Sequence, residues 1–277
     1  MKVKFFDRRI FKIFLEISAI FSAVLSGYLI FFDIPDGQKF KAFLIYLALH
    51  CVLYLGIWVW SNRLNHVEVN IEGTNVTIKV GDIFVEPGFK VIAFNEYFDT
   101  QVDNSLISDE SLNGIFLKKH LGEPISRLDK RIEEFAFEPD EILEMNKSRR
   151  EGKKQKYRLG TIFVSGEYLL AAMSKFDDSN RAVLTMPEYL EFLIRFWDRV
   201  NKVYAQKSVS TPIFGSGITR IKGHRTITDE DLLKIMLWTF RISEMRFKYP
   251  AKLSIIVHHS KIDQINLLDM KLLKNGV

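Results

Sequence analysis

Three segments of the chain place glycine or polar residues directly after short apolar runs. They are Val80–Phe84, Phe94–Thr100 and Thr211–Arg220. In the third segment, Gly215 and Gly217 let backbone amides come close to an anion, because neither residue carries a side chain. This composition would suit a loop that holds a diphosphate, but taken alone a single Gly-x-Gly is more typical of an ordinary turn.

Side chains in these segments have matching hydrogen-bonding chemistry. The Asp82 carboxylate can accept a hydrogen bond from an adenine amino group, and Asn95 can bind a ribose hydroxyl. Ser216 can donate to a phosphate oxygen, and Arg220 adds positive charge. Taken singly, Asp82 and Asn95 are more often cap or turn residues, so a binding site requires the three segments to lie together.

The elements around these segments alternate between strands and helices. Runs with period two, or short apolar runs, predict strands at 66–71, 75–80, 89–94, 159–164, 168–173, 208–214 and 253–257, with a hairpin turn across 72–74. Helical periodicity predicts helices at 108–120, 187–205 and 229–247. The pattern predicts an α/β fold in which a mixed or parallel sheet is covered on both faces. In such sheets, ligands bind beyond the carboxyl ends of the strands.

The first 64 residues have a different composition. Two apolar runs, at about 10–32 and 41–61, are each long enough to cross a bilayer at about 1.5 Å per residue. The turn at Asp33–Gly37 is too short to hold a domain, so we expect a transmembrane helical hairpin at 1–64 and a soluble domain at 65–277. A cleaved signal peptide is the alternative, but bulky residues follow the first run where a cleavage site needs small ones.

Charged and aromatic residues predict the orientation of the hairpin. Basic residues flank its two ends, and Trp58 and Trp60 lie where the second helix would leave the membrane. We therefore expect a multi-pass protein of the cell inner membrane with both termini and the soluble domain in the cytoplasm. Glu16 and His50 would face protein or water, either as packing contacts or along a pore, and a pore would require an oligomer.

Other residue types exclude several classes of site. Cys51 is the single cysteine of the 277 residues, so an intramolecular disulfide and a thiolate metal cluster are both excluded. His258 and His259 lack a metal-ligand spacing. The net charge of +5 is modest, and the basic run at 147–156 predicts a solvated loop or a contact with anionic lipid rather than with nucleic acid.

The order and spacing of the three segments resemble those of a macro domain, the ADP-ribose-binding fold. The likeness extends over about residues 65–277 and includes Gly160-Thr161 before two central strands. The resemblance implies that Asp82 and Ile83 bind the adenosine end and that Asn95 binds the distal ribose. It places Phe98 and Asp99 near the distal end of the ligand. The phosphates would be bound by residues of the third segment, namely Thr211, Gly215, Ser216, Gly217, Ile218, Thr219 and Arg220.

The segment after Asn95 departs from the family pattern. Macro domains that hydrolyse ADP-ribose linkages usually carry a glycine-rich loop there, and Glu96–Gln101 contains no glycine. This departure argues against hydrolysis but not against binding. A membrane-tethered ADP-ribosyl hydrolase, with Asp99 or Asp103 as general base, remains one alternative, and a non-catalytic membrane scaffold remains another.

Two membrane helices followed by a variant macro domain are similar to the membrane effector of type II Thoeris antiphage defence. That resemblance implies a homo-oligomer without cofactor or metal. Its signal would be an ADP-ribose derivative, histidine-ADP-ribose, made by a Toll/interleukin-receptor-like enzyme. The resemblance further implies that the bound signal leads to membrane disruption or growth arrest, as in abortive infection.

Overall fold

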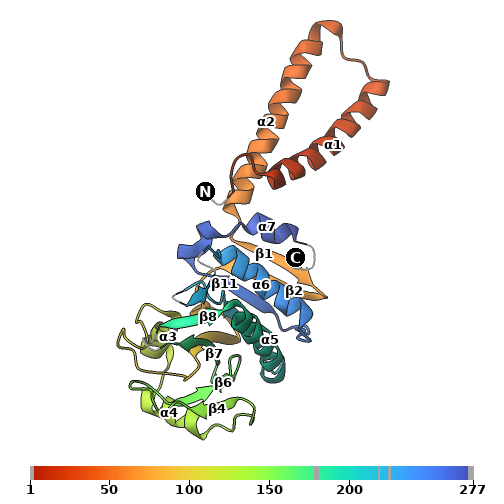
Figure 1. Cartoon of the computed structure of the whole chain (residues 1–277). Helices are drawn as coiled ribbons and strands as arrows, with labels where there is room; N and C mark the ends of the chain where they lie inside the picture. The colour runs from red at the N-terminus through yellow and green to blue at the C-terminus, as the bar shows by residue number, and fades with distance from the viewer. Residues whose placement is uncertain (1–2, 178–180, 218, 224–225, 274–277) are drawn as a thin grey trace.

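An apolar helical hairpin projects from an α/β domain in the computed structural model of the chain (Figure 1). The structure describes residues 3–177, 181–217, 219–223 and 226–273. Helix α1 (Arg8–Phe31) begins where the Asp7 carboxylate accepts a hydrogen bond from the Arg9 amide. A short 3-10 turn, η1 (Asp36–Gln38), leads into α2 (Lys39–Arg63).

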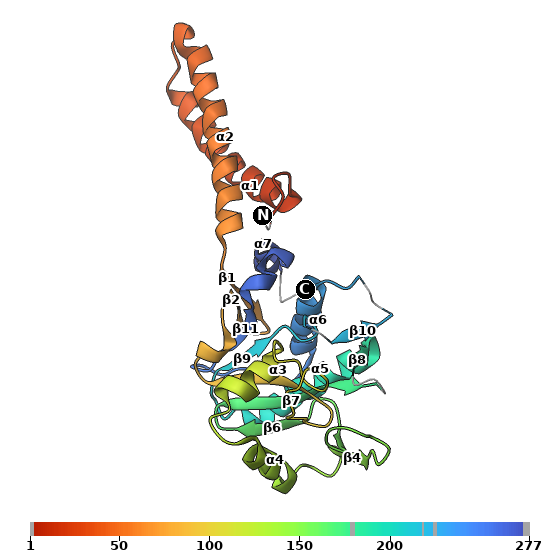
Figure 2. The same ribbon diagram turned by 90° about the vertical axis from the view of Figure 1, so that its left-hand side faces the viewer.

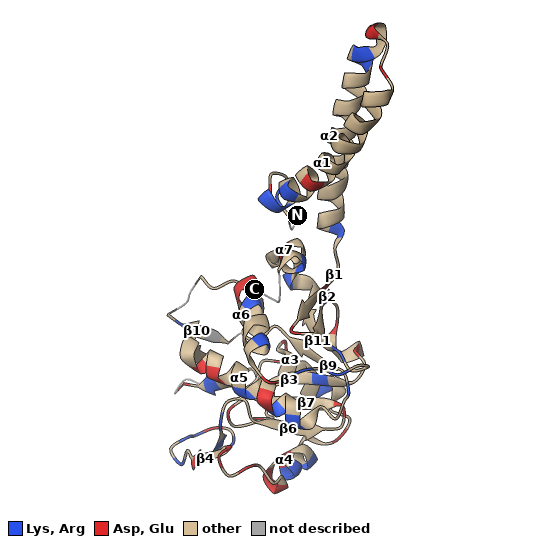
Figure 3. Cartoon of the chain, turned by 90° about the vertical axis from the view of Figure 1, so that its right-hand side faces the viewer, with Lys and Arg blue, Asp and Glu red and all other residues tan. Residues whose placement is uncertain are grey.

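The surface of this hairpin is apolar along most of its length. Both helices are long and apolar enough to cross a membrane, judged by length and composition. In Figure 3 the middle of each helix is free of charged residues, which gather at the tip and near the base of the hairpin. Exposed apolar side chains on α1 include Ile20, Val24 and Ile30, which in water would be costly to expose together.

A nine-stranded mixed sheet forms the centre of the α/β domain. Its strand order is β1-β2-β11-β9-β3-β7-β8-β10, with β6 pairing with β7. Strands β2, β11, β9, β3 and β7 are parallel. Strand β1 is antiparallel to β2, β6 and β8 are both antiparallel to β7, and β10 is parallel to β8. The strands are β1 (His66–Ile71), β2 (Thr74–Val80), β3 (Phe89–Asn95), β6 (Ile162–Ser165), β7 (Tyr168–Phe176), β8 (Ala182–Thr185), β9 (Val209–Pro212), β10 (Arg220–Lys222) and β11 (Leu253–Val257).

Alternating side chains of the central strands bury two separate cores. Val91 of β3 packs on one face with α5 (Met186–Val203) and α6 (Asp229–Ile242), while Ile92 points to the other face. The second core includes residues of α3 (Leu112–Ile115), of the π-helical turn η3 (Phe116–His120) and of α4 (Ile125–Glu134). The fold is therefore α/β with a mixed sheet between helices, as the sequence predicted.

The base of the hairpin meets the β1 edge of the domain. Figures 1 and 2 both show α2 ending next to β1 and the C-terminal helix α7 (Leu267–Leu272). Leu268 of α7 lies in one apolar cluster with Val3, Ile10 and Ile57. The indole nitrogen of Trp58 donates to the carbonyl of Val3 over 3.2 Å. The N-terminal arm is thus held between the hairpin and the domain.

Several element boundaries differ from those predicted. The helix expected at 108–120 begins only at Leu112, and the one expected at 229–247 ends at Ile242. The strand expected at 159–164 starts at Ile162, because Arg158–Thr161 forms a turn. Sequence periodicity did not predict α4, α7, β8, β10 or a two-stranded hairpin made of β4 (Ile142–Met145) and β5 (Gln155–Tyr157).

Candidate ligand-binding site

The carboxyl ends of four parallel strands bring the three predicted segments to one edge of the sheet. Because β2, β11, β9 and β3 are neighbours in that order, the segments that follow them lie in the same order. The segment after β2 begins at Gly81, the one after β9 at Ile213, and the one after β3 at Glu96. The chain after β11, which begins at His258, lies between the segment after β2 and the segment after β9. This is the edge at which parallel α/β sheets bind ligands.

The segment after β2 is a short helical turn, η2 (Ile83–Val85), capped by Asp82. The Asp82 side chain is exposed, and its Oδ1 accepts a hydrogen bond from the amide of Phe84 over 3.0 Å. Ile83 is buried beneath it. Asp82 is therefore both a cap and a side chain that a ligand can reach.

An aromatic stack that the sequence analysis missed borders this turn. The rings of Phe84 and His120 lie parallel, with their centroids 3.8 Å apart. His120 ends the π-helical turn η3, so the stack joins two segments that are distant in sequence. No local signal in the sequence connects the two rings.

The side chain of Asn95 forms hydrogen bonds with the loop that follows it. Its Oδ1 accepts hydrogen bonds from the amides of Tyr97 and Asp99, over 3.0 and 3.2 Å. Its Nδ2 donates to Oδ2 of Asp99 over 2.9 Å, and only 4% of the residue is exposed. Asn95 thus fixes the shape of the loop that the resemblance assigns to the distal ribose.

Phe98 and Asp99 lie in the interior. The Phe98 ring packs in the second core, 5.2 Å from the ring of Tyr157. Asp99 is 1% exposed. Its carboxylate accepts hydrogen bonds from Nη1 and Nη2 of Arg149, over 3.1 and 2.7 Å, and from the amide of Lys153 over 2.8 Å. Both residues shape the loop from inside, and a ligand contact for either stays a prediction.

The basic run at 147–156 is more than a solvated loop. The Arg149 guanidinium lies 3.8 Å from the ring centroid of Tyr97, and its side chain is 7% exposed. Lys153 Nζ donates to the carbonyl of Phe98 over 2.8 Å and pairs with Asp129. The expectation of a solvated loop is wrong for these two residues, because they bind the β4–β5 hairpin to the loop after Asn95.

Glu96 is a second buried acid at this edge, and it was not among the predicted site residues. Burial raises the pKa of its carboxyl above the ordinary value, and the nearby Lys156 ammonium opposes that rise. Its Oε1 accepts the amide of Phe176 over 3.4 Å. At 2% exposure it supports the ends of β3 and β7 from inside. An acid directly after the last residue of a buried strand was the available signal.

The segment after β9 forms a compact turn. The Ser216 hydroxyl donates to the carbonyl of Ile213 over 2.8 Å, and the Phe214 amide donates to Met236 Sδ over 3.4 Å. Gly217 is exposed, and an added Cβ there would meet nothing within 4 Å. Thr211 is fully buried at the end of β9. The other predicted residues are Gly215, packed on α6; Thr219, partly buried; Arg220, whose backbone begins β10; and Ile218, outside the described residues.

Comparison with known proteins identifies the family of this domain. A family model described as "Thoeris protein ThsA, Macro domain" matches residues 76–258. Thoeris protein ThsA of Bacillus amyloliquefaciens (strain Y2) is 37% identical over 261 residues, covering 91% of this chain and 86% of that protein. The chain belongs to the ThsA macro-domain family. This confirms the resemblance drawn from the order of Asp82, Asn95 and Gly215.

Solved macrodomains are more distant from this ThsA-family chain. The Oceanobacillus iheyensis macrodomain with ADP is 18% identical, with a TM-score of 0.46 over 75% of this chain and 94% of that one. A mutant of that macrodomain with ADPR is 16% identical, with a TM-score of 0.46 over 75% of this chain and 96% of that one. At this level of similarity, the two solved macrodomains do not indicate which ligand this chain binds.

The N-terminus of α6 is unsuited to an anion in this ThsA-family domain. Its first turn contains Asp229, Glu230 and Asp231, and the Thr228 side chain caps the helix. Hydrogen bonds from Thr228 hold the pKa of Asp231 below its ordinary value, so that carboxylate stays charged. The negative charges oppose the helix dipole that would otherwise attract phosphate. A diphosphate would therefore depend on the amides of the segment after β9.

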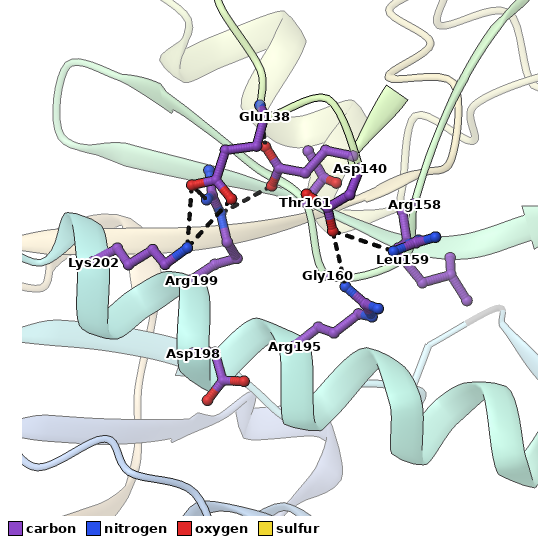
Figure 4. Close-up of a pocket in the computed structure, with 11 residues that line it drawn as sticks. Glu138, Asp140, Arg158, Leu159, Gly160, Thr161, Arg195, Asp198, Arg199 and Lys202 are labelled. Atoms are coloured by element: carbon purple, nitrogen blue, oxygen red, sulfur yellow. Dashed lines mark hydrogen bonds and ion pairs between the residues drawn. The ribbon is translucent and has the colours of Figure 1, made fainter. Parts of the chain in front are cut away.

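A cavity of about 130 Å³ lies between α5 and the segments 138–141 and 158–161 (Figure 4). Its charges pair with one another: Arg199 Nη1 lies 2.6 Å from Glu138 Oε1, and Arg158 Nη1 lies 3.2 Å from Asp140 Oδ2. None of the three predicted segments contributes to its lining. The cavity is a charge-compensated seam between α5 and the rest of the domain. Within the described residues, no cluster of His, Cys, Asp or Glu is suited to hold a metal ion.

Proposed function

We propose that the chain is a membrane-anchored effector of Thoeris antiphage defence whose soluble domain binds an ADP-ribose-derived nucleotide. The observation that carries the proposal is the meeting of three segments at one sheet edge, within a domain that matches the ThsA macro-domain model. Histidine-ADP-ribose, made by a Toll/interleukin-receptor-like enzyme, is the proposed signal. A cofactor has no part in the proposal.

The proposed pose runs along the edge of the sheet. Asp82 and Ile83 hold the adenosine end, and Asn95, with its loop, holds the distal ribose. The segment after β9 holds the phosphates, because exposed Gly217 leaves its backbone open to an anion. In this pose Phe98 and Asp99 act from inside the loop, and buried Thr211 supports the segment after β9 from beneath. The other phosphate contacts come from Gly215, Ser216, Ile218, Thr219 and Arg220.

The hairpin is proposed to lie in the cell inner membrane, with both termini and the soluble domain in the cytoplasm. Its outward apolar side chains would contact lipid, while the exposed carboxylate of Glu16 would contact water or a second copy of the chain. A single hairpin cannot enclose a channel, so the membrane response would need an oligomer. Disruption of the membrane would then stop growth of the infected cell.

We propose binding rather than hydrolysis, because both candidate bases are poorly suited to catalysis. Asp99 is enclosed and already accepts hydrogen bonds from Arg149, Lys153 and Asn95. Hydrogen bonds from the amides of Leu106 and Ser105 lower the pKa of the Asp103 carboxyl. A general base works best with a pKa near the working pH, so Asp103 would be a weak base.

Calorimetric titration of the full chain in lipid nanodiscs tests this proposal. Each titration uses ADP-ribose or histidine-ADP-ribose. Gly217→Glu adds a negative charge where the phosphates would lie, and Gly217→Gln adds nearly the same volume without charge. Saturable binding, lost in Gly217→Glu and retained in Gly217→Gln, supports the proposal. Absence of binding of both nucleotides to the unmodified chain would refute it and favour the scaffold alternative, whereas turnover of ADP-ribosylated protein would favour the hydrolase.

A further inference from the structure

Helix α6 contacts the predicted phosphate segment with one of its faces. A Cβ added to Gly215 would lie 3.3 Å from Leu232 Cδ1, so the leucine packs directly against the turn. One helical turn later, Met236 Sδ accepts the amide of Phe214 over 3.4 Å. Any shift of this segment therefore presses on α6.

Another part of the same helix faces the C-terminal helix α7. Lys234 Nζ lies 2.8 Å from Glu230 Oε1 and 2.7 Å from Asp269 Oδ2. The other carboxylate oxygen of Glu230 accepts the amide of Asn266 over 2.9 Å, just before α7 begins. Helix α6 and helix α7 are thus joined by a chain of charged groups.

Asp269 continues that chain into the hairpin. Its Oδ1 lies 2.7 Å from Nε of Arg9, which belongs to the first turn of α1. The Asp269 side chain is only 12% exposed, so both of its ion pairs are partly shielded from solvent. Beside it, Lys271 Nζ lies 4.6 Å from the ring centroid of Trp60 in α2. Helix α7 therefore contacts both helices of the hairpin.

We propose that Asp269 couples the candidate ligand site to the hairpin. A displacement of the segment after β9 moves α6 as a rigid helix, and the Lys234–Asp269–Arg9 chain passes that movement to the base of α1. A ligand can drive such a change only if it favours one of two arrangements of this chain. The ligand response in this proposal rests on the proposed function, whereas the mechanical link between α6 and α1 does not.

The first test measures dye release from vesicles that contain the full chain, with and without histidine-ADP-ribose. Asp269→Asn keeps the shape of the side chain but removes its charge from both ion pairs. The release ratio is the rate of dye release with nucleotide divided by the rate without it. We expect this ratio to fall about fivefold or more in Asp269→Asn, as expected for loss of a typical coupling energy. Arg9→Gln should lower the ratio in the same direction. Nucleotide affinity, measured by calorimetry on the same vesicles, should change less than the release ratio.

Glu72→Gln is the matched control. Glu72 Oε1 lies 3.2 Å from Nε of Arg241, a residue of α6. The substitution breaks this ion pair and leaves the Lys234–Asp269–Arg9 ion pairs unchanged. Its release ratio should equal that of the unmodified protein. An unchanged ratio in Asp269→Asn, with nucleotide binding intact, would overturn the proposal.

A ligand-free measurement separates this proposal from the proposed function. Spin labels on the native Cys51, exposed in α2, and on Lys248→Cys, at an exposed loop position, report the distance between hairpin and domain. We expect Asp269→Asn to broaden the distance distribution and Glu72→Gln to leave it unchanged. If the unmodified chain binds neither nucleotide, the proposed function fails while this measurement still decides the link. An equally narrow distribution in Asp269→Asn would then overturn the proposal.

Discussion

Asn95 and Asp99 hold each other across the turn that follows β3. Asn95 Nδ2 donates to Asp99 Oδ2 over 2.9 Å, and Asn95 Oδ1 accepts the backbone amide of Asp99 over 3.2 Å. Arg149 and Lys153 complete the set of donors around the Asp99 carboxylate. The loop proposed to bind the distal ribose is therefore fixed by buried charge and not by glycine.

Removing the partner of Asp99 should destabilise the domain strongly. Arg149→Met keeps much of the side-chain volume but leaves the Asp99 carboxylate, which is 1% exposed, without its guanidinium. Breaking a buried pair from one side costs about 3–5 kcal/mol. We expect a clearly lower melting temperature in thermal unfolding of the detergent-solubilised chain. Arg150→Met, at an exposed neighbouring position, should leave it nearly unchanged. Equal melting temperatures for the two variants would contradict the role given to Arg149.

Glu96 should make stability depend on pH. Burial raises its pKa in the folded state above the ordinary value of 4.5, so the folded protein binds more protons than the unfolded chain between those two pKa values. Stability contributed by this group is present at lower pH and is lost as the pH rises through that window. Glu96→Gln removes this dependence. The melting temperature of the variant, relative to the unmodified protein, should therefore rise as the pH rises from about 4.5.

Glu144→Gln is the control for that pH series, because Glu144 is exposed on the β4–β5 hairpin. Its melting temperature should follow that of the unmodified protein at every pH. If the difference in melting temperature between Glu96→Gln and the unmodified protein were the same at every pH, the pKa of Glu96 would not change on folding.

Periodicity predicted the elements that lie deep in the domain and failed at the margins. Strands β3 and β7 each contain an uninterrupted apolar run, at 91–94 and 168–173, because both of their faces are buried there, and α5 has a regular apolar face. By contrast, β8 and β10 are four and three residues long; β8 pairs with β7, and β10 pairs with β8. Helix α7 has six residues and is held by tertiary contacts with the hairpin. Such short elements carry little signal in sequence.

The site was predictable at the level of loops and less so at the level of side chains. Strand order at one edge follows from the parallel strands, so the meeting of Asp82, Asn95 and Gly215 could be inferred. The internal roles of Phe98 and Asp99 could not, because they depend on contacts distant in sequence. Phe98 packs against Tyr157, and Asp99 pairs with Arg149, which is 50 residues away. Charge in a basic run gives no indication of which of its members is buried.

Gly88 is needed where β3 begins beside β9. Its φ of +76° is in the left-handed region, and an added Cβ would overlap the carbonyl oxygen of Ser208. Gly166 also has a positive φ, +58°, but nothing lies within 4 Å of its added Cβ. Gly166→Ala should therefore cost about 1–2 kcal/mol of stability from the backbone alone. Gly88→Ala should cost clearly more, as measured by the denaturant midpoint of each variant. Equal midpoints would show that the backbone near Ser208 moves away at little cost.

Tyr189 connects α5 to the predicted phosphate segment, and its removal should affect both stability and binding. Its hydroxyl donates to the carbonyl of Phe214 over 2.9 Å, and burial raises the pKa of the phenol, so the hydroxyl keeps its proton at neutral pH. Tyr189→Phe leaves that carbonyl unsatisfied and should lower stability by about 1–3 kcal/mol. Because the turn at Phe214 then loses a fixed point, nucleotide affinity measured by calorimetry should fall as well. Tyr204→Phe, which alters a tyrosine packed against Phe247 at the far end of α5, is the control and should retain full affinity. A loss of stability in Tyr189→Phe without any loss of affinity would show that this segment does not contact the ligand.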